Sequence, residues 1–295
     1  MRQCRSEPAM ACCIVIVLGL VLLSIFHTTS LRTILAPSNL GHLEGPPCSW
    51  PGTNSTTAII TLLTDKPFEY GQGALRLIRS IQANGGVPGV DMVLLELAEK
   101  PLPAEMRKLL VSAGWYTCVV PRIPPSFDDW IPEPFIDQYS KLHIWRMVQY
   151  QRVLYLDSDC LVTGSLKPLM NLSLEHKIWA GRDFRNGIWV SGFNMGVFMI
   201  RPDVTEFARL LELKQDPAFT YEFKMAEQGF LNAVYSGQWA ELDFVYNANL
   251  AVYLQDPSTW ARFKDKIRVV HFTMSKPWSC DWKLYEPLCF AWTFG

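Results

Sequence analysis

A short apolar stretch that ends in two aspartates constrains the fold more than any other part of this 295-residue chain. Residues 153–156 are apolar and follow Arg152, as expected for a strand buried inside a parallel sheet. Asp157 and Asp159 come next, and because unpaired charge is costly to bury, they must lie where the strand ends. In α/β sheets, ligands bind at the carboxyl ends of the strands. Two aspartates one residue apart at a rigid strand end suit a hard divalent cation with oxygen ligands.

The same sequence motif allows two other interpretations. In the first, the aspartates are solvated acids of an ordinary turn. In the second, an apolar strand followed by D-x-D-x-x-x-T resembles the haloacid-dehalogenase phosphatases, in which the first aspartate is a nucleophile and the second a general acid. That chemistry also needs a hydroxyl, a lysine and a downstream acidic pair. Ser191 and Lys214 are candidates for the first two, but the pair Asp128 and Asp129 lies upstream.

The N-terminal region carries a separate signal, an uncharged apolar run over residues 9–26 with Arg2 and Arg5 before it. Such a run just spans a bilayer, and its basic side favours the cytoplasm. The alternative is a cleaved signal peptide, whose apolar region is usually about 7–15 residues long. We expect an uncleaved anchor, and both interpretations put the rest of the chain in the secretory lumen. The glycosylation sequons at Asn54 and Asn171 agree with that compartment.

Composition and cysteines narrow the class of protein further. With 49% hydrophobic and 19% charged residues, the chain can build a sizeable core. Its net charge of -1 argues against a nucleic-acid partner held by bulk electrostatics. In an oxidising lumen, Cys280 and Cys289 are a candidate disulfide pair. Cys118 and Cys160 lie in strand-like stretches and are interpreted as buried thiols.

Apolar strand-like runs alternate with helical patterns along the rest of the chain, which indicates βαβ units and a mainly parallel sheet. The helix over residues 104–113 is predicted to turn Leu109 and Leu110 inward. Besides the strand at 153–156, strands are predicted at residues 57–63, 91–97, 115–120, 178–181, 193–200 and 269–271, and helices at 71–83, 104–113, 140–150, 204–213 and 226–235.

Polar motifs recur at the ends of these predicted strands, and their order and spacing together resemble the family 8 glycosyltransferases, which include glycogenin, galactinol synthase and plant glucuronosyltransferases. The resemblance covers about residues 58–280. The matching motifs are Leu-Leu-Thr-Asp at 62–65 with Gly-Ala-Leu at 73–75, Ser-Lys-Leu-His-Ile-Trp at 140–145, Tyr-Leu-Asp-Ser-Asp at 155–159, Phe-Asn-Met-Gly-Val at 193–197, Glu-Gln-Gly-Phe-Leu-Asn at 227–232, and residues 271–278.

The resemblance implies a role for each motif residue. A divalent metal, usually manganese, is implied to bind three of them: Asp157, Asp159 and His271. Contacts to the UDP-sugar are implied for uridine (Leu62, Thr64 and Tyr70), ribose (Ser158), diphosphate (Lys276) and the donor sugar (Lys141, Asp183, Asn194, Glu227 and Gln228). Within the last group, Asp183 and Gln228 are the catalytic candidates, and Asp183 is the best candidate for polarising the acceptor or the sugar.

The chemistry of the proposed reaction agrees with these residue types. Breaking a sugar–phosphate bond leaves negative charge on a diphosphate, which a metal on two aspartates neutralises as a Lewis acid. Lys276 adds a positive point charge, and a histidine ligand such as His271 shifts the preference from magnesium towards manganese. Three motifs depart from the usual family pattern: Met195 stands where serine is common, Glu227 where aspartate is common, and Met274 in the region of the final motif where a glycine between the histidine and the lysine is common. These departures bear on the donor sugar more than on the reaction type.

The final motif, residues 271–278, is one residue shorter than in glycogenin. This shorter motif and the predicted anchor resemble the plant glucuronosyltransferase branch of the family more than glycogenin. A glucuronate carboxylate needs a cation, and Arg182 and Arg185 flank Asp183, so UDP-glucuronate is the predicted donor. We expect three regions: a cytoplasmic tail and signal anchor over residues 1–30, a stem over 31–56, and a glycosyltransferase domain over 57–295. The last region is predicted to be a single α/β domain of the GT-A type. It is expected to lie in the lumen, with the anchor in a Golgi or other secretory-pathway membrane.

The predicted function is transfer of a hexose or hexuronic acid from a UDP-sugar, with retention at the anomeric carbon, to a glycan, lipid or protein. The alternatives are the phosphatase and an inactive carbohydrate-binding member of the family.

Overall fold

A seven-stranded sheet forms the centre of the fold, with strand order β3-β2-β1-β4-β7-β6-β8. The computed structural model describes residue 48 and residues 54–64, 66–125, 131–132 and 135–294, all within one compact unit, Gly45–Gly295. The predicted anchor at 9–26, Asp65, Asp128 and Asp129 lie outside the described residues. The strands of this sheet are β1 (Thr57–Leu63), β2 (Asp91–Leu97), β3 (Tyr116–Val120), β4 (Arg152–Leu156), β6 (Ile178–Arg185), β7 (Ile188–Ile200) and β8 (Trp239–Leu242).

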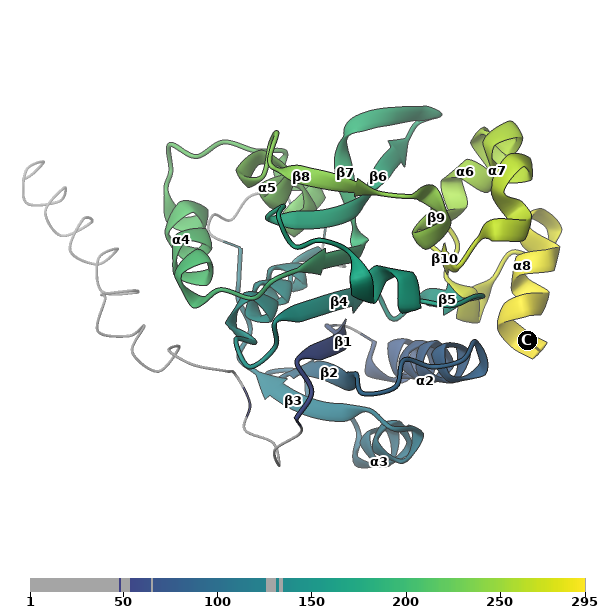
Figure 1. Cartoon of the computed structure of the whole chain (residues 1–295), viewed down its shortest axis with the longest axis horizontal. Helices are drawn as coiled ribbons and strands as arrows, with labels where there is room; N and C mark the ends of the chain where they lie inside the picture. The colour runs from purple at the N-terminus through teal and green to yellow at the C-terminus, as the bar shows by residue number, and fades with distance from the viewer. Residues whose placement is uncertain (1–47, 49–53, 65, 126–130, 133–134, 295) are drawn as a thin grey trace, which may run out of the picture. The chain divides into compact units, whose positions relative to one another are not determined.

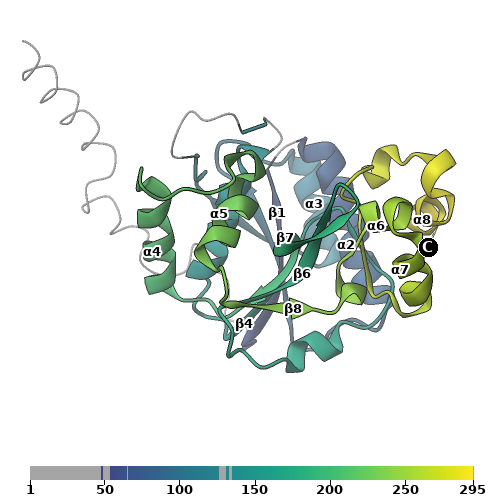
Figure 2. The same cartoon turned by 90° about the horizontal axis from the view of Figure 1, so that it is seen from above.

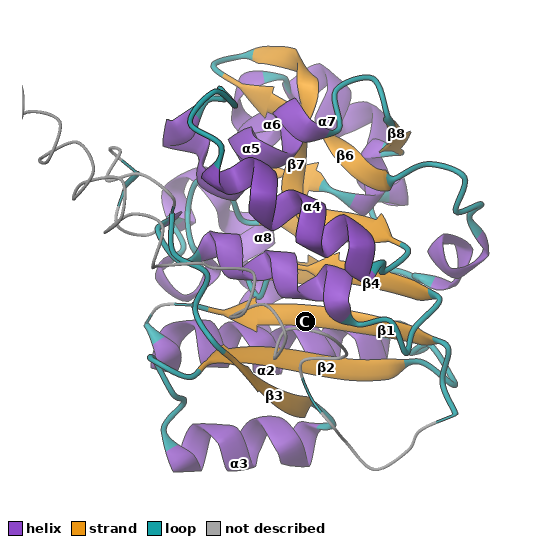
Figure 3. Cartoon of the chain, turned by 90° about the vertical axis from the view of Figure 1, so that its left-hand side faces the viewer, coloured by secondary structure: helices purple, strands orange, loops and turns teal. Residues whose placement is uncertain are grey.

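The sheet is mainly parallel, as the sequence predicts. Strands β1, β2, β3 and β4 run in one direction, and Figure 3 shows them side by side. Strand β7 is antiparallel to β4, with Leu156 paired to Val197. The carboxyl ends of β1 and β4 therefore meet at one edge of the sheet, and the middle of β7 passes beside that edge.

Helices cover both faces of the sheet (Figures 1 and 2). One face packs on α2 (Pro67–Ala83) and α3 (Ala104–Ala113), because alternate strand residues such as Ile59 and Leu154 share a core with the buried stripe of α2. The other face lies under α4 (Val204–Gln215), α5 (Ala226–Val234) and the 3-10 helix η4 (Gln138–Arg146). Burial of both faces explains why the central strands are almost continuously apolar.

A second, three-stranded sheet carries the C-terminal part of the chain. It consists of β5 (Cys160–Val162), β10 (Val269–His271) and β9 (Ala248–Asn249), with β10 in the middle. In the β5–β10 register, His271 lies opposite Cys160. This pairing brings His271 next to Cys160, the residue that follows Asp159, although the two paired residues are 111 positions apart in the sequence. Helices α6 (Leu250–Gln255), α7 (Pro257–Phe263) and α8 (Trp282–Phe294) complete this end.

Several predicted elements differ from the structure. The segment predicted as a helix over 140–150 is the 3-10 helix η4, which is buried along most of its length. The strands predicted at 178–181 and 193–200 are parts of a longer hairpin, β6–β7. The turn of this hairpin is formed by Asn186 and Gly187, both with positive φ. An Asn-Gly pair is a typical sequence signal for such a turn, and the prediction did not use it. Helix α8 was not predicted.

The prediction that Leu109 faces inward was wrong. Its side chain is 50% exposed, whereas Met106 and Leu110 carry the contact with the core. Only a narrow stripe of α3 side chains packs against the core, because this helix lies beside the edge strand β3.

Cysteine pairing was predicted only in part. Cys280 and Cys289 form the candidate disulfide, and Cys160 is a buried free thiol, as predicted. Cys118 was wrongly interpreted as a thiol, because it is bonded to Cys48 with 5.7 Å between their Cα atoms. Cys118 lies on edge strand β3, which a segment from outside the sheet can reach.

Among the helices that the structure describes, none combines the length and the apolar composition needed to cross a bilayer.

Candidate active site

The candidate site is built where β4 ends, beside the middle of β7. Asp157 follows β4 directly, and its backbone N–H donates to the carbonyl of Gly196 on β7 at 2.7 Å. Asp159 comes two residues later, just before β5. The Asp159 side chain is almost fully buried, and that of Asp157 is 26% exposed. The two carboxylates therefore lie at the edge of the central sheet, one inside the protein and one open to solvent.

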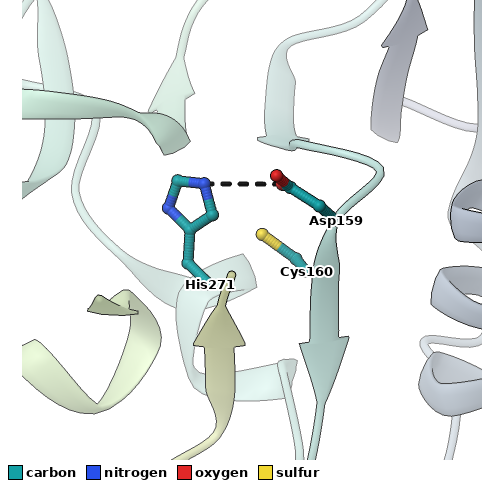
Figure 4. Close-up of side chains that lie close together, drawn as sticks. All are labelled: Asp159, Cys160 and His271. Atoms are coloured by element: carbon teal, nitrogen blue, oxygen red, sulfur yellow. Dashed lines mark ion pairs between the residues drawn. The ribbon is translucent and has the colours of Figure 1, made fainter. Parts of the chain in front are cut away.

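His271 faces both carboxylates. Its Nε2 lies 3.6 Å from Asp157 Oδ2 and 3.5 Å from Asp159 Oδ1 (Figure 4 shows the second pair). Its Nδ1 lies 3.0 Å from Asn247 Oδ1. Since an amide oxygen only accepts, Nδ1 carries the proton and Nε2 presents its lone pair to the aspartates. A ring nitrogen oriented in this way by a partner on the other nitrogen is typical of a metal-binding histidine.

Asp159 supplies a second sign of a cation site. Its Oδ1 is buried and has no hydrogen-bond partner among the described residues, although buried polar atoms normally have one. Asp159 and His271 also form, with the thiol of Cys160, a cluster whose potential ligand atoms lie within 4.8 Å of one another. Ligands about 2.1 Å from one ion lie about 3.0–3.5 Å apart. The oxygen and the nitrogen therefore fit a divalent cation.

Two lysines compensate the acidic charge. Lys276 Nζ contacts Asp159 Oδ2 at 2.5 Å. Lys141 Nζ lies 3.1 Å from Asp157 Oδ1 and 2.9 Å from Glu227 Oε1. Burial lowers the pKa of both lysines, but the neighbouring carboxylates outweigh burial and raise it, so both stay protonated. The pKa of Glu227 is raised by burial against the effect of Lys141. We attribute full charge to Lys141, because two carboxylates share it.

The predicted donor-sugar residues form a hydrogen-bonded group. Gln228 Nε2 donates to Asp183 Oδ2 at 3.0 Å, and Asn194 Nδ2 lies 3.4 Å from Asp183 Oδ1. Arg185 Nε lies 3.0 Å from Asp183 Oδ2. Burial raises the pKa of Asp183 more than Arg185 lowers it. This group borders a small cavity of about 60 Å³.

Asn194 and Asn247 connect the sugar group to the metal group. Asn247 Nδ2 donates to Asn194 Oδ1 at 3.2 Å, while its own oxygen accepts from His271. The amide chain thus runs from Asp183 to His271 through two asparagines.

The predicted uridine residues lie at the end of β1 and the start of α2. Leu62 and Thr64 are buried, and Thr64 Oγ1 accepts from Gln138. The ring of Tyr70 meets that of Trp278 edge to face, with centroids 4.6 Å apart. Ser158 is buried beside Gly73, where a Cβ would lie 2.5 Å from the Ser158 carbonyl oxygen. Trp278 therefore borders this side of the site, whereas Trp145 is a core residue stacked on Phe198 and Tyr235.

Sequence reasoning missed two residues of the site. Tyr155 donates its hydroxyl to Asp157 Oδ1 at 2.7 Å, and burial raises its pKa, so it remains a donor. Strand alternation puts Tyr155 and Asp157 on one side of the sheet, so this contact was predictable. No sequence pattern pointed to Asn247, because it lies in an irregular segment before β9, where strand alternation gives no information on side-chain direction.

Comparison with known proteins agrees with this architecture. The family model described as glycosyl transferase family 8 matches residues 135–281. Galactinol synthase 1 of Solanum lycopersicum is 28% identical over 255 residues, which cover 76% of this chain and 74% of that protein. Human glycogenin-1 is 31% identical over 243 residues, which cover 78% of this chain and 63% of glycogenin.

Solved structures share the fold at low sequence identity. The galactosyltransferase LgtC, in complex with donor and acceptor sugar analogs, aligns with a TM-score of 0.60 at 18% identity, covering 80% of this chain and 95% of LgtC. The glycosyltransferase GlyE of Streptococcus pneumoniae aligns with a TM-score of 0.56 at 22% identity, covering 77% of this chain and 57% of GlyE. The domain thus has the GT-A type of glycosyltransferase fold, as predicted. The chain belongs to glycosyltransferase family 8.

Family membership removes the phosphatase interpretation. The two residues that it nominated also lie elsewhere: Ser191 is exposed on β7, and Lys214 is on α4 with its ammonium over the ring of Tyr139.

Proposed function

We propose that this chain is a retaining transferase that moves a hexose or hexuronic acid from a UDP-sugar to a glycan, lipid or protein acceptor, with Mn²⁺ at the Asp157, Asp159 and His271 side chains. One observation supports the metal most strongly: the buried Asp159 Oδ1 has no hydrogen-bond partner in the described part of the chain and lies 3.5 Å from His271 Nε2. Carboxylate oxygen together with imidazole nitrogen is a donor set that favours manganese over magnesium.

The surrounding side chains support transfer from a nucleotide diphosphate. When bound, the cation supplies a Lewis acid that neutralises charge on the leaving diphosphate. Lys276 provides a further positive charge at the same place and holds Asp159 until a diphosphate replaces that contact. Gln228 and Arg185 hold Asp183 in one orientation, from which we expect it to polarise the acceptor or the sugar. Leu62, Thr64, Tyr70 and Ser158 are proposed to hold the nucleoside.

For the donor we propose UDP-glucuronate. Of the two arginines that flank Asp183, Arg185 is the one beside its carboxylate, and its Nη1 also lies 3.0 Å from Glu222 Oε2. Glu222 is 57% exposed and can turn to solvent, which would release the guanidinium for the carboxylate of a glucuronate. Arg182 instead donates to the carbonyl of Val190.

A donor screen tests the proposed function. Purified protein is offered UDP-glucose, UDP-galactose and UDP-glucuronate with Mn²⁺ or with a chelator, and UDP release is measured. We expect metal-dependent release from one donor, and none from Asp159→Asn. Glu105→Gln, an exposed carboxylate on α3, is the control and should behave as the unmodified protein. Binding of UDP with Mn²⁺ but no release from any donor would instead indicate an inactive, carbohydrate-binding member.

We further propose that residues 9–26 anchor the chain in a secretory-pathway membrane, with the domain in the lumen of the Golgi. The disulfides Cys48–Cys118 and Cys280–Cys289 support an oxidising compartment, and the sequon residues Asn54 and Asn171 are exposed. N-terminal sequencing of the mature protein tests this proposal. A mature chain that begins near Ser30 would contradict the anchor.

A further inference from the structure

A cavity of about 570 Å³ lies outside the candidate active site, between α2, the 3-10 helix Pro277–Ser279 (η9) and α8. Its walls are held together firmly. Arg76 on α2 donates to the carbonyl of Ala291 on α8 at 2.9 Å, and the Cys280–Cys289 disulfide joins the segment before α8 to the middle of that helix. The cavity therefore belongs to the fold and does not depend on a loose C-terminal end.

The cavity is basic. Arg76 and Arg79 both line it, one turn apart on α2, and no acidic residue is among the described residues that line it. Burial lowers the pKa of Arg76, and the like charge of Arg79 lowers it further. An anion placed between the two guanidinium groups would offset their like charges and accept hydrogen bonds from both.

Helix α8, which forms one wall of the cavity through Trp292 and Thr293, carries exposed apolar side chains. Trp282 lines the cavity and is 46% exposed, and Leu284 follows it on α8 at 49%. Phe290 and Phe294 are 58% and 68% exposed, and their rings lie 5.0 Å apart on the last turns of the same helix. Exposed aromatic and aliphatic side chains beside arginines are typical of surfaces that enter the headgroup region of a membrane.

We propose that this cavity binds the phosphate of an anionic phospholipid, with the exposed side chains of α8 entering the bilayer interface. The exposed apolar side chains of α8 favour a lipid over a soluble anionic glycan, because a glycan bound in the cavity would leave Phe290 and Phe294 in water. Trp278 lines the cavity and also contacts Tyr70 of the proposed uridine site, so a membrane docked here lies beside the donor. Binding of a phospholipid in this cavity requires neither the metal nor the UDP-sugar.

Tryptophan quenching by brominated lipid tests the proposal. The full chain is reconstituted in phosphatidylcholine vesicles with brominated acyl chains, with or without phosphatidic acid. Residues 1–49 contain no tryptophan, so the N-terminal apolar run contributes no signal. We expect extra quenching when phosphatidic acid is present, and loss of that extra quenching in Trp282→Phe.

Charge variants separate the cavity from general basicity. Arg79→Gln keeps the Arg76–Ala291 hydrogen bond and should remove most of the extra quenching, and the Arg76→Gln/Arg79→Gln variant should remove all of it. Lys264→Gln/Lys266→Gln removes the same charge from exposed positions between α7 and β10 and should change nothing. Equal quenching in both vesicle types would overturn the proposal. So would arginine-dependent binding of inorganic phosphate or of polygalacturonate without quenching, which would indicate a site for a soluble anion.

Discussion

At the residue scale, the proposed metal site depends on a histidine whose two ring nitrogens face different partners. Asn247 accepts from Nδ1 of His271, and Nε2 faces Asp157 and Asp159 at 3.6 and 3.5 Å. Removing Asp159 should therefore have a different effect from removing the His271 imidazole. Of the three proposed metal ligands, only Asp159 also contacts Lys276.

Asp159→Ala should abolish sugar transfer at every manganese concentration, because it removes a metal ligand together with the carboxylate that Lys276 contacts. His271→Ala should weaken manganese binding by about 10–100-fold, and excess metal should restore part of the activity. Titration of activity and of Mn²⁺ binding by electron paramagnetic resonance measures both effects. Full activity of Asp159→Ala would contradict the assignment of this side chain.

A second prediction at this scale concerns the donor. Arg185→Ala should lose preference for UDP-glucuronate over UDP-glucose, while affinity for UDP itself changes little, because Arg185 lies beside Asp183 and not beside the proposed uridine residues. Competition assays with the three nucleotides measure both quantities, and Arg182→Ala is the matched control. A clear preference of the unmodified enzyme for UDP-glucose would refute the donor proposal.

At the scale of elements, the register of two strand pairs determines the site. Strand β7 passes Gly196 beside Asp157, and β10 places His271 opposite Cys160. These two elements come so close that a Cβ on Gly196 would lie 1.9 Å from Cε1 of His271. Glycine at this position is therefore required by the approach of the imidazole ring.

Gly196→Ala should displace the His271 ring and lower Mn²⁺ affinity by at least about tenfold, with little change in far-ultraviolet circular dichroism. Ser191→Ala, exposed on the same strand, is the control and should bind Mn²⁺ normally. Unchanged metal binding in Gly196→Ala would mean that His271 is not a ligand.

The buried 3-10 helix η4 makes a prediction about pH. His143 Nε2 donates to the carbonyl of Pro121 at 2.7 Å, and Arg146 donates to Nδ1 at 3.3 Å, so the ring must be neutral. Burial lowers the pKa of His143 to about 4; the hydrogen bond to Pro121 opposes this shift, and the charge of Arg146 adds to it. In the unfolded chain the pKa is about 6.5. The unfolded chain thus binds the proton first, and the stability contributed above pH 6.5 is lost as pH falls towards 4.

Between pH 7 and pH 5 this single histidine should cost about 2 kcal/mol of the free energy of unfolding. Urea unfolding of the unmodified protein and of His143→Gln at both pH values measures this difference, because the variant should lack that component. His176→Gln, at an exposed position, is the control. A pH dependence identical in His143→Gln and the unmodified protein would contradict a buried neutral ring.

At the scale of the whole molecule, the sequence predicted the sheet and the carboxylates but not how distant segments meet. Strand periodicity located β1, β2, β4 and β10, because these strands are buried and apolar. The meeting of His271 with Asp159 was expected only from family resemblance, since it depends on the β5–β10 pairing. Asn247 and the Cys48–Cys118 disulfide had no local signal, because each depends on contacts made only in the folded chain.

The most direct test of the metal site is anomalous scattering at the manganese absorption edge, from crystals soaked in Mn²⁺ and UDP. We predict one strong peak about 2.0–2.6 Å from carboxylate oxygens of Asp157 and Asp159 and bound to Nε2 of His271, with the UDP diphosphate beside Lys276. A peak at another place, or UDP bound here with no metal between it and the two aspartates, would contradict the account.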